Sequence, residues 1–444
     1  MRSLSSSHSA VRAALALLAM GALACTETAR DEGPAFHARA APLRPRGCVE
    51  LSQQAGLAEK LKAGREGESF CLAPGLYFGP LTLATGVTLY GPPSAVIRST
   101  GEGTTLLLAS RTRLLGLTVD GSGSRFDVLD AAIKLDQGED VLIEGVTIDH
   151  ALFGILLNQS KRVQVLGNHV RGVGGPALGL RGDGIHLWET YDSLVEANLV
   201  ENTRDVVVWY SSRNVLRGNE VRGGRYGTHF MYSHHNRLEG SRYLGNEVGV
   251  FVMYSRDLEV LGNTILDSSG AAGMGLGVKE SGNLTVRGNL FVHDTIGLFL
   301  DNSPLDLGDK NLFEGNVIRM GDVGVAFLST THDNVFKRNA FRDNHLPVRV
   351  ESGGDAIGLT WDGNEFDDYV GYDLDGDGVG DLPYELSDLS NVLESRNASL
   401  AFLRGTPALA LVSMAGHVVP LFAPKPVLRD PHPSMKTLER SDAH

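Results

Sequence analysis

Soft metal-binding side chains recur on one short stretch of the chain. His229 and Met231 are two residues apart, and Met253 occupies the same position in the next repeat unit. Residues two apart in an extended strand share a face. Imidazole and thioether groups together are donors that favour Cu(I). The spacing therefore predicts a copper site at His229, Met231 and Met253, with a purely stabilising side-chain stack as the alternative.

A second set of candidate ligands is acidic. Aspartates stand at positions one, three, five and nine of a loop with glycine at position six, as in a calcium-binding loop. These residues are Asp373, Asp375, Asp377 and Asp381. Tyr384 takes position twelve, where a bidentate glutamate is usual, and no helical pattern flanks the loop. Calcium binding and an irregular hydrated turn are both compatible with this segment.

The elements that carry the copper candidates belong to a repeat. Similar short phrases start at residues 184, 205, 227, 249, 275 and 297, and turns such as Gly218-Asn219 follow them. A period of this length is typical of a solenoid, in which neighbouring coils share one core. The sequence therefore predicts an all-β fold, a solenoid of stacked parallel coils of about 21–27 residues each.

Alternation within each phrase predicts which side chains face the core. The second and fourth residues are almost all apolar and are expected inside, whereas the third and fifth are expected to face outward. The outward fifth position forms a column of Trp188, Trp209, Met231 and Met253, followed by Lys279 and Asp301, and the next position adds Tyr210, Tyr232 and Tyr254. Such an apolar column predicts a partner-docking face. The alternative is a structural ladder covered by another segment.

Two cysteines predict a crosslink near the start of the repeat. Cys48 and Cys71 form the pair left once Cys25 is set aside, and in an oxidising compartment they are expected to form a disulfide. That bridge would contribute about 3 kcal/mol by restricting the unfolded chain. A cysteine-based metal site is the alternative, but no further Cys or His lies near enough in sequence to complete it.

Composition and the chain ends limit the remaining choices. A formal net charge of −13 argues against a nucleic-acid partner. Residues 1–24 have the pattern of a secretory signal peptide, and Cys25 is either a lipidation site that anchors the chain to a membrane or follows an ordinary cleavage site. The predicted organisation continues with a flexible linker (25–45), an N-terminal cap and first coils (46–95), the β-helix (96–385), and a C-terminal cap or docking segment and tail (386–444), with a short helix within 400–424.

Several of these segments resemble the NosD family. The resemblance rests on Asp183–Trp188, Arg204–Ser211, Gly224–His234, Val248–Ser255, Gly275–Lys279, Leu300–Pro304, Gly371–Gly378 and Phe402–Ala408, and it extends over about residues 70–435. It implies a right-handed parallel β-helix that is a periplasmic, non-catalytic maturation factor. This factor works with the ABC transporter subunits NosF and NosY and the copper chaperone NosL. Such a factor supplies copper, or sulfur, to nitrous oxide reductase. The family supplies no ligand set for this chain, so the copper candidates rest on the strand register.

A different class of β-helix protein is the competing interpretation. A polysaccharide lyase or uronate epimerase would place a calcium-assisted carboxylate and a general base in a surface groove. Asp430-Pro431-His432 resembles an epimerase motif, although it lies in the tail rather than in a coil. A purely structural solenoid is a third possibility and predicts neither metal nor transporter.

Overall fold

The computed structural model describes residues 35–52, 54–175, 177–328, 332–351, 354–387 and 426–440. All described secondary structure belongs to the unit Phe36–His444. The predicted signal peptide, Cys25 and the predicted helix within 400–424 lie outside the described residues.

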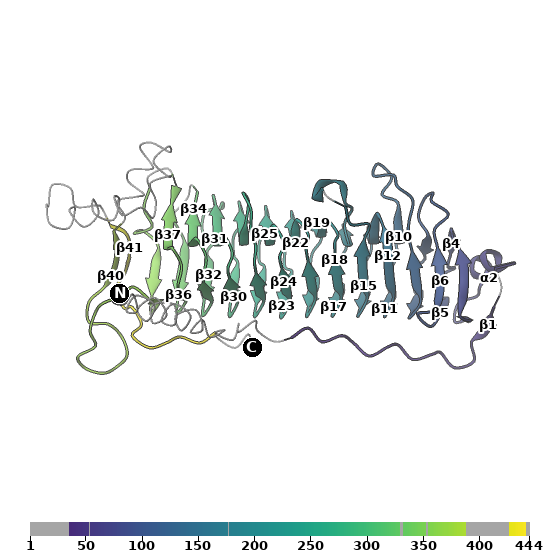
Figure 1. Ribbon diagram of the computed structural model, residues 1–444, viewed down its shortest axis with the longest axis horizontal. Coiled ribbons are helices and arrows are strands. Elements are labelled where there is room, and N and C mark those ends of the chain that lie inside the picture. The colour runs from purple at the N-terminus through teal and green to yellow at the C-terminus, as the bar shows by residue number, and fades with distance from the viewer. Residues whose placement is uncertain are drawn as a thin grey trace, which may run out of the picture. The chain divides into compact units, whose positions relative to one another are not determined.

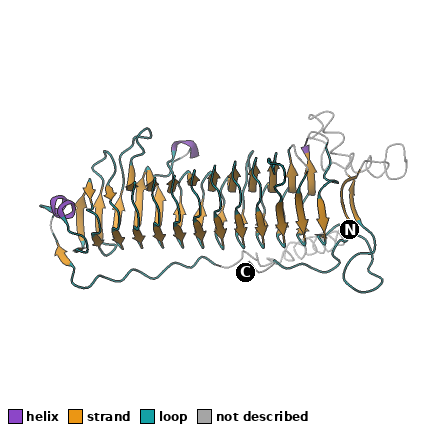
Figure 2. Cartoon of the chain, turned by 180° about the vertical axis from the view of Figure 1, so that it is seen from behind, coloured by secondary structure: helices purple, strands orange, loops and turns teal. Residues whose placement is uncertain are grey.

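The described chain coils repeatedly through three parallel sheets, which we call A, B and C (Figures 1 and 2). Each full coil gives one strand to each sheet, and every strand pairs with its counterpart in the next coil. Because apolar side chains alternate along these short strands, each coil buries its inner side only against its neighbours. The predicted all-β solenoid of stacked parallel coils is therefore confirmed.

The strands of the three sheets follow in their order along each sheet. Sheet A contains β1 (Val49–Leu51), β2 (Ser69–Leu72), β5 (Thr88–Tyr90), β8 (Arg113–Leu115), β11 (Leu142–Glu144), β14 (Gln164–Leu166), β17 (Leu194–Glu196), β20 (Val215–Arg217), β23 (Arg237–Glu239), β26 (Glu259–Leu261), β29 (Thr285–Arg287), β32 (Asn311–Glu314), β35 (Asn334–Lys337) and β38 (Thr360–Asp362). Sheet B contains β3 (Gly75–Phe78), β6 (Ala95–Arg98), β9 (Thr118–Asp120), β12 (Thr147–Ala151), β15 (His169–Gly172), β18 (Leu199–Glu201), β21 (Glu220–Arg222), β24 (Arg242–Leu244), β27 (Thr264–Leu266), β30 (Leu290–Val292), β33 (Val317–Arg319), β36 (Ala340–Arg342) and β39 (Glu365–Phe366). Sheet C contains β4 (Leu81–Thr82), β7 (Leu106–Leu108), β10 (Ala131–Asp136), β13 (Phe153–Asn158), β16 (Ile185–Trp188), β19 (Asp205–Trp209), β22 (Tyr226–Met231), β25 (Val248–Met253), β28 (Met274–Lys279), β31 (Ile296–Asp301), β34 (Val323–Phe327) and β37 (Leu346–Val350).

The core of sheet C follows the predicted alternation. The twelve side chains expected inside are between 0% and 3% exposed. They are Ile185, Leu187, Val206, Val208, Thr228, Phe230, Val250, Val252, Leu276, Val278, Leu298 and Leu300. The sequence pattern thus predicted correctly which side chains of these strands face the core.

Buried amides connect the coils at one of the turns. Asn263 accepts the Ser241 N–H at Oδ1 (2.9 Å), and its Nδ2 donates to the Leu238 carbonyl (3.1 Å). Equivalent pairs recur along the solenoid and satisfy buried backbone groups that the turns would otherwise leave unpaired. The ladder contains Asn168, Asn198, Asn219, Asn263, Asn289, Asn316, Asn339 and Asn364.

The N-terminal end of the solenoid is closed by a short helix and a crosslink. The helix α2 (Leu57–Ala63) buries Leu57 and Leu61 over the first coils. A disulfide joins Cys48 to Cys71 in β2, with the two Cα atoms 5.7 Å apart.

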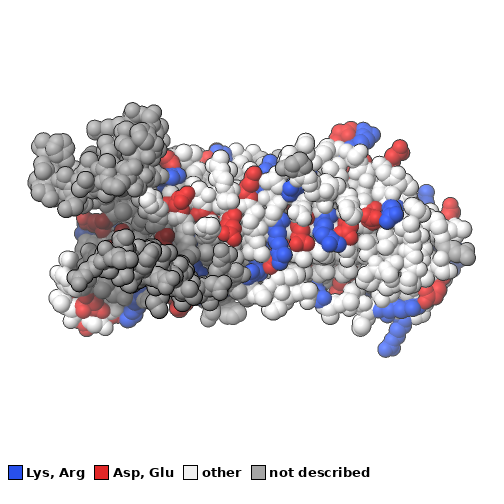
Figure 3. All heavy atoms as spheres, viewed as in Figure 1, with Lys and Arg blue, Asp and Glu red and all other residues white. Residues whose placement is uncertain are grey.

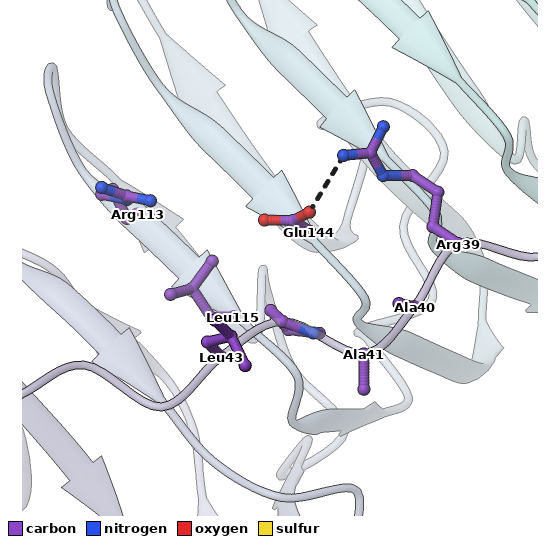
Figure 4. Close-up of a pocket in the computed structure, with 8 residues that line it drawn as sticks. Arg39, Ala40, Ala41, Leu43, Arg113, Leu115 and Glu144 are labelled. Carbon is purple, nitrogen blue, oxygen red and sulfur yellow. Dashed lines mark hydrogen bonds and ion pairs between the residues drawn. The ribbon is translucent and has the colours of Figure 1, made fainter.

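The segment that precedes this end lies along sheet A, where a flexible linker was predicted. Arg39 bonds to Glu144 of β11 (3.3 Å) and to Glu196 of β17 (2.8 Å), and Leu43 lies beside Leu115 of β8 (Figures 1 and 4). Acidic and basic side chains are interspersed on the face shown in Figure 3. The two ion pairs of Arg39 place this segment against acidic side chains of sheet A.

The C-terminal end of the solenoid differs from the prediction. The parallel coils end at Phe366, before the predicted boundary at residue 385. Strand β40 (Tyr384–Ser387) then pairs antiparallel with β41 (Pro426–Asp430), and Tyr384 stacks on Phe366 at 3.9 Å. Beyond β41, Leu438 packs against Leu290, Val317 and Ala340 on sheet B. The described residues include one further short helix, η1 (Leu178–Leu180).

No helix in the part of the chain that the structure describes is both long and apolar enough to cross a membrane.

Candidate functional site

The predicted outward column is present on sheet C. The strand pairing places Trp188, Trp209, Met231, Met253, Lys279 and Asp301 in register on six successive coils. The four apolar members are half-buried rather than fully exposed. Parallel strands about 4.8 Å apart force such residues to contact one another, so the column is a continuous surface.

The neighbouring column is buried, which corrects part of the prediction. His186, Val207 and His229 were expected to face outward into solvent, but they are only 4%, 0% and 5% exposed. Large side chains on both sides close over them. The His229 ring, for example, packs edge-on against Trp209 (5.4 Å between centroids) and Tyr226 (4.9 Å). Alternation predicted the direction of these side chains but not the crowding around them.

Two of the three predicted copper ligands meet directly. The distance from His229 Nε2 to Met253 Sδ is 3.2 Å, and Met231 is the register partner of Met253 on the adjacent coil. Metal bonds to imidazole nitrogen and to sulfur are about 2.0–2.3 Å long. The separation of these two atoms is compatible with one ion bound to both, and copper at this site stays a prediction.

The surroundings of His229 keep the imidazole neutral. Burial, with a smaller contribution from the positive charge of Arg225, lowers the pKa of His229 to about 4. The indole Nε1–H of Trp209 donates to His229 Nδ1 at 3.2 Å. A neutral ring is the form that binds metal ions, because a lone pair must be available.

A buried charge network, which the sequence reasoning missed, supports this histidine column. His186 Nδ1 lies 2.8 Å from Asp183, and Arg204 pairs with the same carboxylate at 2.9 Å. Asp205 accepts from Arg225 at 3.1 Å and from the backbone N–H of Tyr226 at 3.1 Å. Charged residues directly before successive strands were the available sequence signal. Their pairing depends on contacts between coils, so the spacing alone did not reveal it.

The three tyrosines of the docking prediction form a stack beside the column. Tyr210 and Tyr232 lie 5.2 Å apart at 11°, and Tyr232 and Tyr254 lie 4.8 Å apart at 14°. Tyr210 and Tyr232 are 40% and 42% exposed, and Tyr210 also contacts Trp188 at 5.0 Å. All three have a positive φ of 50–51°, which is uncommon for bulky residues. The same left-handed conformation recurs at this turn in other coils, for example at Glu189, so it belongs to the solenoid turn.

The acidic loop brings three of its four predicted ligands together. Carboxylate oxygens of Asp373, Asp375 and Asp377 all lie within 4.8 Å of one another. Asp381 instead accepts the backbone N–H of Leu374 at 2.7 Å. The ammonium group of Lys436 donates to the carbonyl of Asp377 at 2.5 Å. Calcium at this loop stays a prediction.

The Asp-Pro-His segment has a structural role. Asp430 is buried, and its Oδ2 accepts the backbone and side-chain N–H groups of Asn364 at 3.0 and 2.8 Å. It therefore ends the asparagine ladder at the C-terminal cap. His432 follows it in the tail and contacts Asp362 at 3.1 Å. Because Asp430 is buried in these bonds, the segment offers no support for an epimerase site.

The fold and the site together define a class of protein: a parallel β-helix with a half-buried column of Trp and Met side chains beside a column of buried histidines on one sheet. Residues 166–371 match the family described as periplasmic copper-binding protein (NosD). The chain is 32% identical over 398 residues to a probable ABC transporter binding protein NosD of Pseudomonas aeruginosa, covering 85% of this chain and 90% of the relative. A protein of the same name from Stutzerimonas stutzeri is 30% identical over 385 residues, covering 82% and 86%. The chain belongs to the NosD family.

Solved structures share the fold at low sequence identity. The catalytic unit of a GH87 α-1,3-glucanase from Streptomyces thermodiastaticus aligns with a TM-score of 0.56 at 16% identity, over 74% of this chain and 68% of that one. The surface adhesin PfbA of Streptococcus pneumoniae aligns with a TM-score of 0.51 at 12% identity, over 68% and 92%. An enzyme and an adhesin on the same scaffold show that the fold alone does not specify activity.

Proposed function

We propose that this chain is a non-catalytic periplasmic accessory protein that accepts a Cu(I) ion at His229 and Met253, with help from Met231, and passes it on. The observation that carries the proposal is the 3.2 Å separation of His229 Nε2 and Met253 Sδ. Neutral imidazole and thioether are soft donors that suit Cu(I). The family description as copper-binding supports the same cargo.

The available side chains suit copper binding better than they suit sulfur transfer. A sulfur carrier needs a free thiol as its nucleophile. Among the residues that the structure describes, the cysteines are Cys48 and Cys71, and both are in the disulfide. His229 and Met253 offer lone pairs to a metal ion but no group that forms a persulfide.

The small number of donors suits a site that releases its cargo. Two or three protein ligands leave at least one coordination position open, so a ligand from a partner can enter before the first ligands leave. The half-buried column and the tyrosine stack lie beside this site and form the surface on which a partner would dock.

The partners follow from the family and from the names of the relatives. Both relatives are named as probable ABC transporter binding proteins. We therefore infer that such a transporter consists of NosF and NosY, and that the docking face of this chain binds its permease subunit. The copper chaperone NosL would load the site, and nitrous oxide reductase would receive the ion. Cys25, if lipidated, would hold the chain at the membrane.

Anaerobic titration with Cu(I) in competition with a colorimetric chelator tests the metal site. The wild-type protein is expected to bind one equivalent, and His229→Leu and Met253→Leu to lose it. Met320→Leu is a matched control, because Met320 is 47% exposed and lies outside sheet C. Equal stoichiometry in all four proteins would remove the proposed site.

A further inference from the structure

Trp209 occupies an unusual position between two histidines. Its ring is edge-on to His229, with centroids 5.4 Å apart, and lies 5.8 Å from His186 at 65°. Its indole N–H donates to His229 Nδ1 at 3.2 Å, while His229 Nε2 contacts Met253 Sδ. The three groups form a chain that runs from Trp209 N–H through the imidazole to the thioether.

This hydrogen bond and metal binding at His229 Nε2 exclude each other. The indole is only a donor, so His229 Nδ1 must use its lone pair to accept from Trp209. In a neutral ring the proton is then on Nε2 and points at Met253. A metal ion at Nε2 needs the lone pair there, so the ring carries its proton on Nδ1 instead. The number of protons on the ring is unchanged, but two N–H groups would now oppose each other.

A second acceptor lies on the other side of the indole. His186 Nδ1 lies 2.8 Å from a carboxylate oxygen of Asp183, so a ring that carries one proton places it on Nδ1 and has its lone pair on Nε2. The His186 side chain is only 5% exposed, and its Nε2 is buried without a hydrogen-bond partner. An unpaired buried acceptor is costly and calls for an explanation.

We propose that Trp209 is a positioning residue with two alternative acceptors: its indole N–H bonds to His229 Nδ1 while the metal site is empty and to His186 Nε2 when His229 binds a soft monovalent cation. This inference rests on the proposed metal site. It assigns a use to the unpaired acceptor of His186 and to the charge pair of Asp183 and Arg204 that fixes its tautomer.

The consequence is a surface that differs between the loaded and empty protein. Trp209 is the register partner of Trp188 and Met231 in the docking column, and its ring contacts Trp188 at 6.0 Å. When the indole turns from one histidine to the other, the middle of this column changes shape. A partner that contacts the column can then distinguish protein that carries an ion from protein that does not.

Indole NMR of the full chain tests this switch directly, with Ag(I) as a stable probe for Cu(I). The chain has three tryptophans. Trp361 is buried and donates to the carbonyl of Ala356 at 3.0 Å, far along the sequence from the site, so its indole signal is the internal reference. Trp209→Phe identifies the Trp209 signal by its loss. One equivalent of Ag(I) is expected to shift the Trp209 signal strongly and leave the Trp361 signal in place.

A double-mutant cycle on Ag(I) affinity separates the switch from a merely structural role. His186→Phe keeps an aromatic ring but removes the second acceptor, so it should weaken Ag(I) binding about tenfold and speed exchange of the Trp209 N–H in the loaded protein. The Trp209→Phe variant loses one hydrogen bond in the empty protein and one in the loaded protein. Its affinity for Ag(I) should therefore stay within about threefold of wild type. In the Trp209→Phe background, His186→Phe should have no further effect.

Different results would contradict the proposed metal site and the proposed switch. If Ag(I) binding is insensitive to Met253→Leu, the proposed function is wrong. If Ag(I) binds in a Met253-dependent way but the Trp209 signal does not move, the switch is wrong and the metal site survives. Additive losses from Trp209→Phe and His186→Phe would likewise overturn the switch, since they would show that Trp209 only supports the shape of the site.

Discussion

His229 Nε2 and Met253 Sδ lie 3.2 Å apart although 24 residues separate them in the chain. One coil of the solenoid brings them together, with each side chain in a neighbouring strand of sheet C. The register of these parallel strands is fixed by the buried alternate residues, so the backbone positions of the two residues are set by the core beneath them. The donors thus meet without any rearrangement of the chain.

Metal affinity should depend little on pH near neutrality. The pKa of His229 is lowered to about 4, so the ring is already neutral and protons do not compete with the ion. We expect Ag(I) affinity to be constant from about pH 8 to about pH 5 and to fall below that range. Isothermal titration calorimetry over this interval measures it. A tenfold loss per pH unit that begins near pH 6.5 would show an ordinary, solvated histidine.

Partner docking should require the aromatic column. Trp188→Ala combined with Tyr210→Ala removes two rings that contact each other at 5.0 Å. Co-purification of the transporter permease from the native host in mild detergent is expected to fall at least about tenfold, because central aromatic residues dominate such interfaces. Tyr372→Ala is the control, since Tyr372 is 49% exposed in a distant loop. Unchanged recovery of the permease would favour a purely stabilising ladder.

Asp294→Asn should stabilise the protein at neutral pH. Complete burial raises the pKa of Asp294 well above its ordinary value, and its Oδ2 has no hydrogen-bond partner. The unfolded chain ionises this carboxyl above about pH 4, whereas the folded chain resists ionisation, so stability is lost as pH rises. At the equivalent turn, Asn246 accepts the Gly224 N–H and donates to the Val221 carbonyl.

The measurement for Asp294→Asn is the free energy of unfolding in denaturant at two pH values. We expect a gain of about 1–3 kcal/mol at pH 7 and a smaller difference at about pH 3.5. A variant that is no more stable than wild type at pH 7 would contradict the buried, protonated carboxyl.

The asparagine ladder should be essential for stability. Asn263→Ala leaves the Ser241 N–H and the Leu238 carbonyl without their partner in the core. Two unpaired buried groups should cost about 2–4 kcal/mol of unfolding free energy. Asn158→Ala, on the outer face of sheet C, should cost less than about 1 kcal/mol. Thermal unfolding of both variants compares them, and equal losses would argue against the ladder.

The acidic loop gives a separate prediction. If Asp373, Asp375 and Asp377 hold calcium, millimolar Ca²⁺ should raise the midpoint of thermal unfolding, and Asp375→Asn should abolish the rise. An equal response to Mg²⁺ or to neither ion would leave the loop as a hydrated turn closed by Lys436.

Sequence patterns were most informative where the physics is periodic. The repeat period predicted the coils, and the alternation of apolar residues predicted the buried set from Ile185 to Leu300 and the column from Trp188 to Asp301. These features follow from side chains that switch faces at every residue. The same alternation also predicted that His229 and Met253 share one face of sheet C.

The way in which neighbouring coils close around the site depends on tertiary contacts that the sequence pattern does not reveal. The burial of His229, the Trp209 hydrogen bond to it and the pairing of Asp183 with His186 and Arg204 depend on contacts across coils. The position of the N-terminal segment could not be predicted either, because Arg39 pairs with Glu144 and Glu196, which are far from it in sequence. A strand pattern determines which way a side chain points. Whether it then meets water, a ring or a charge depends on the size of neighbours that only folding brings together.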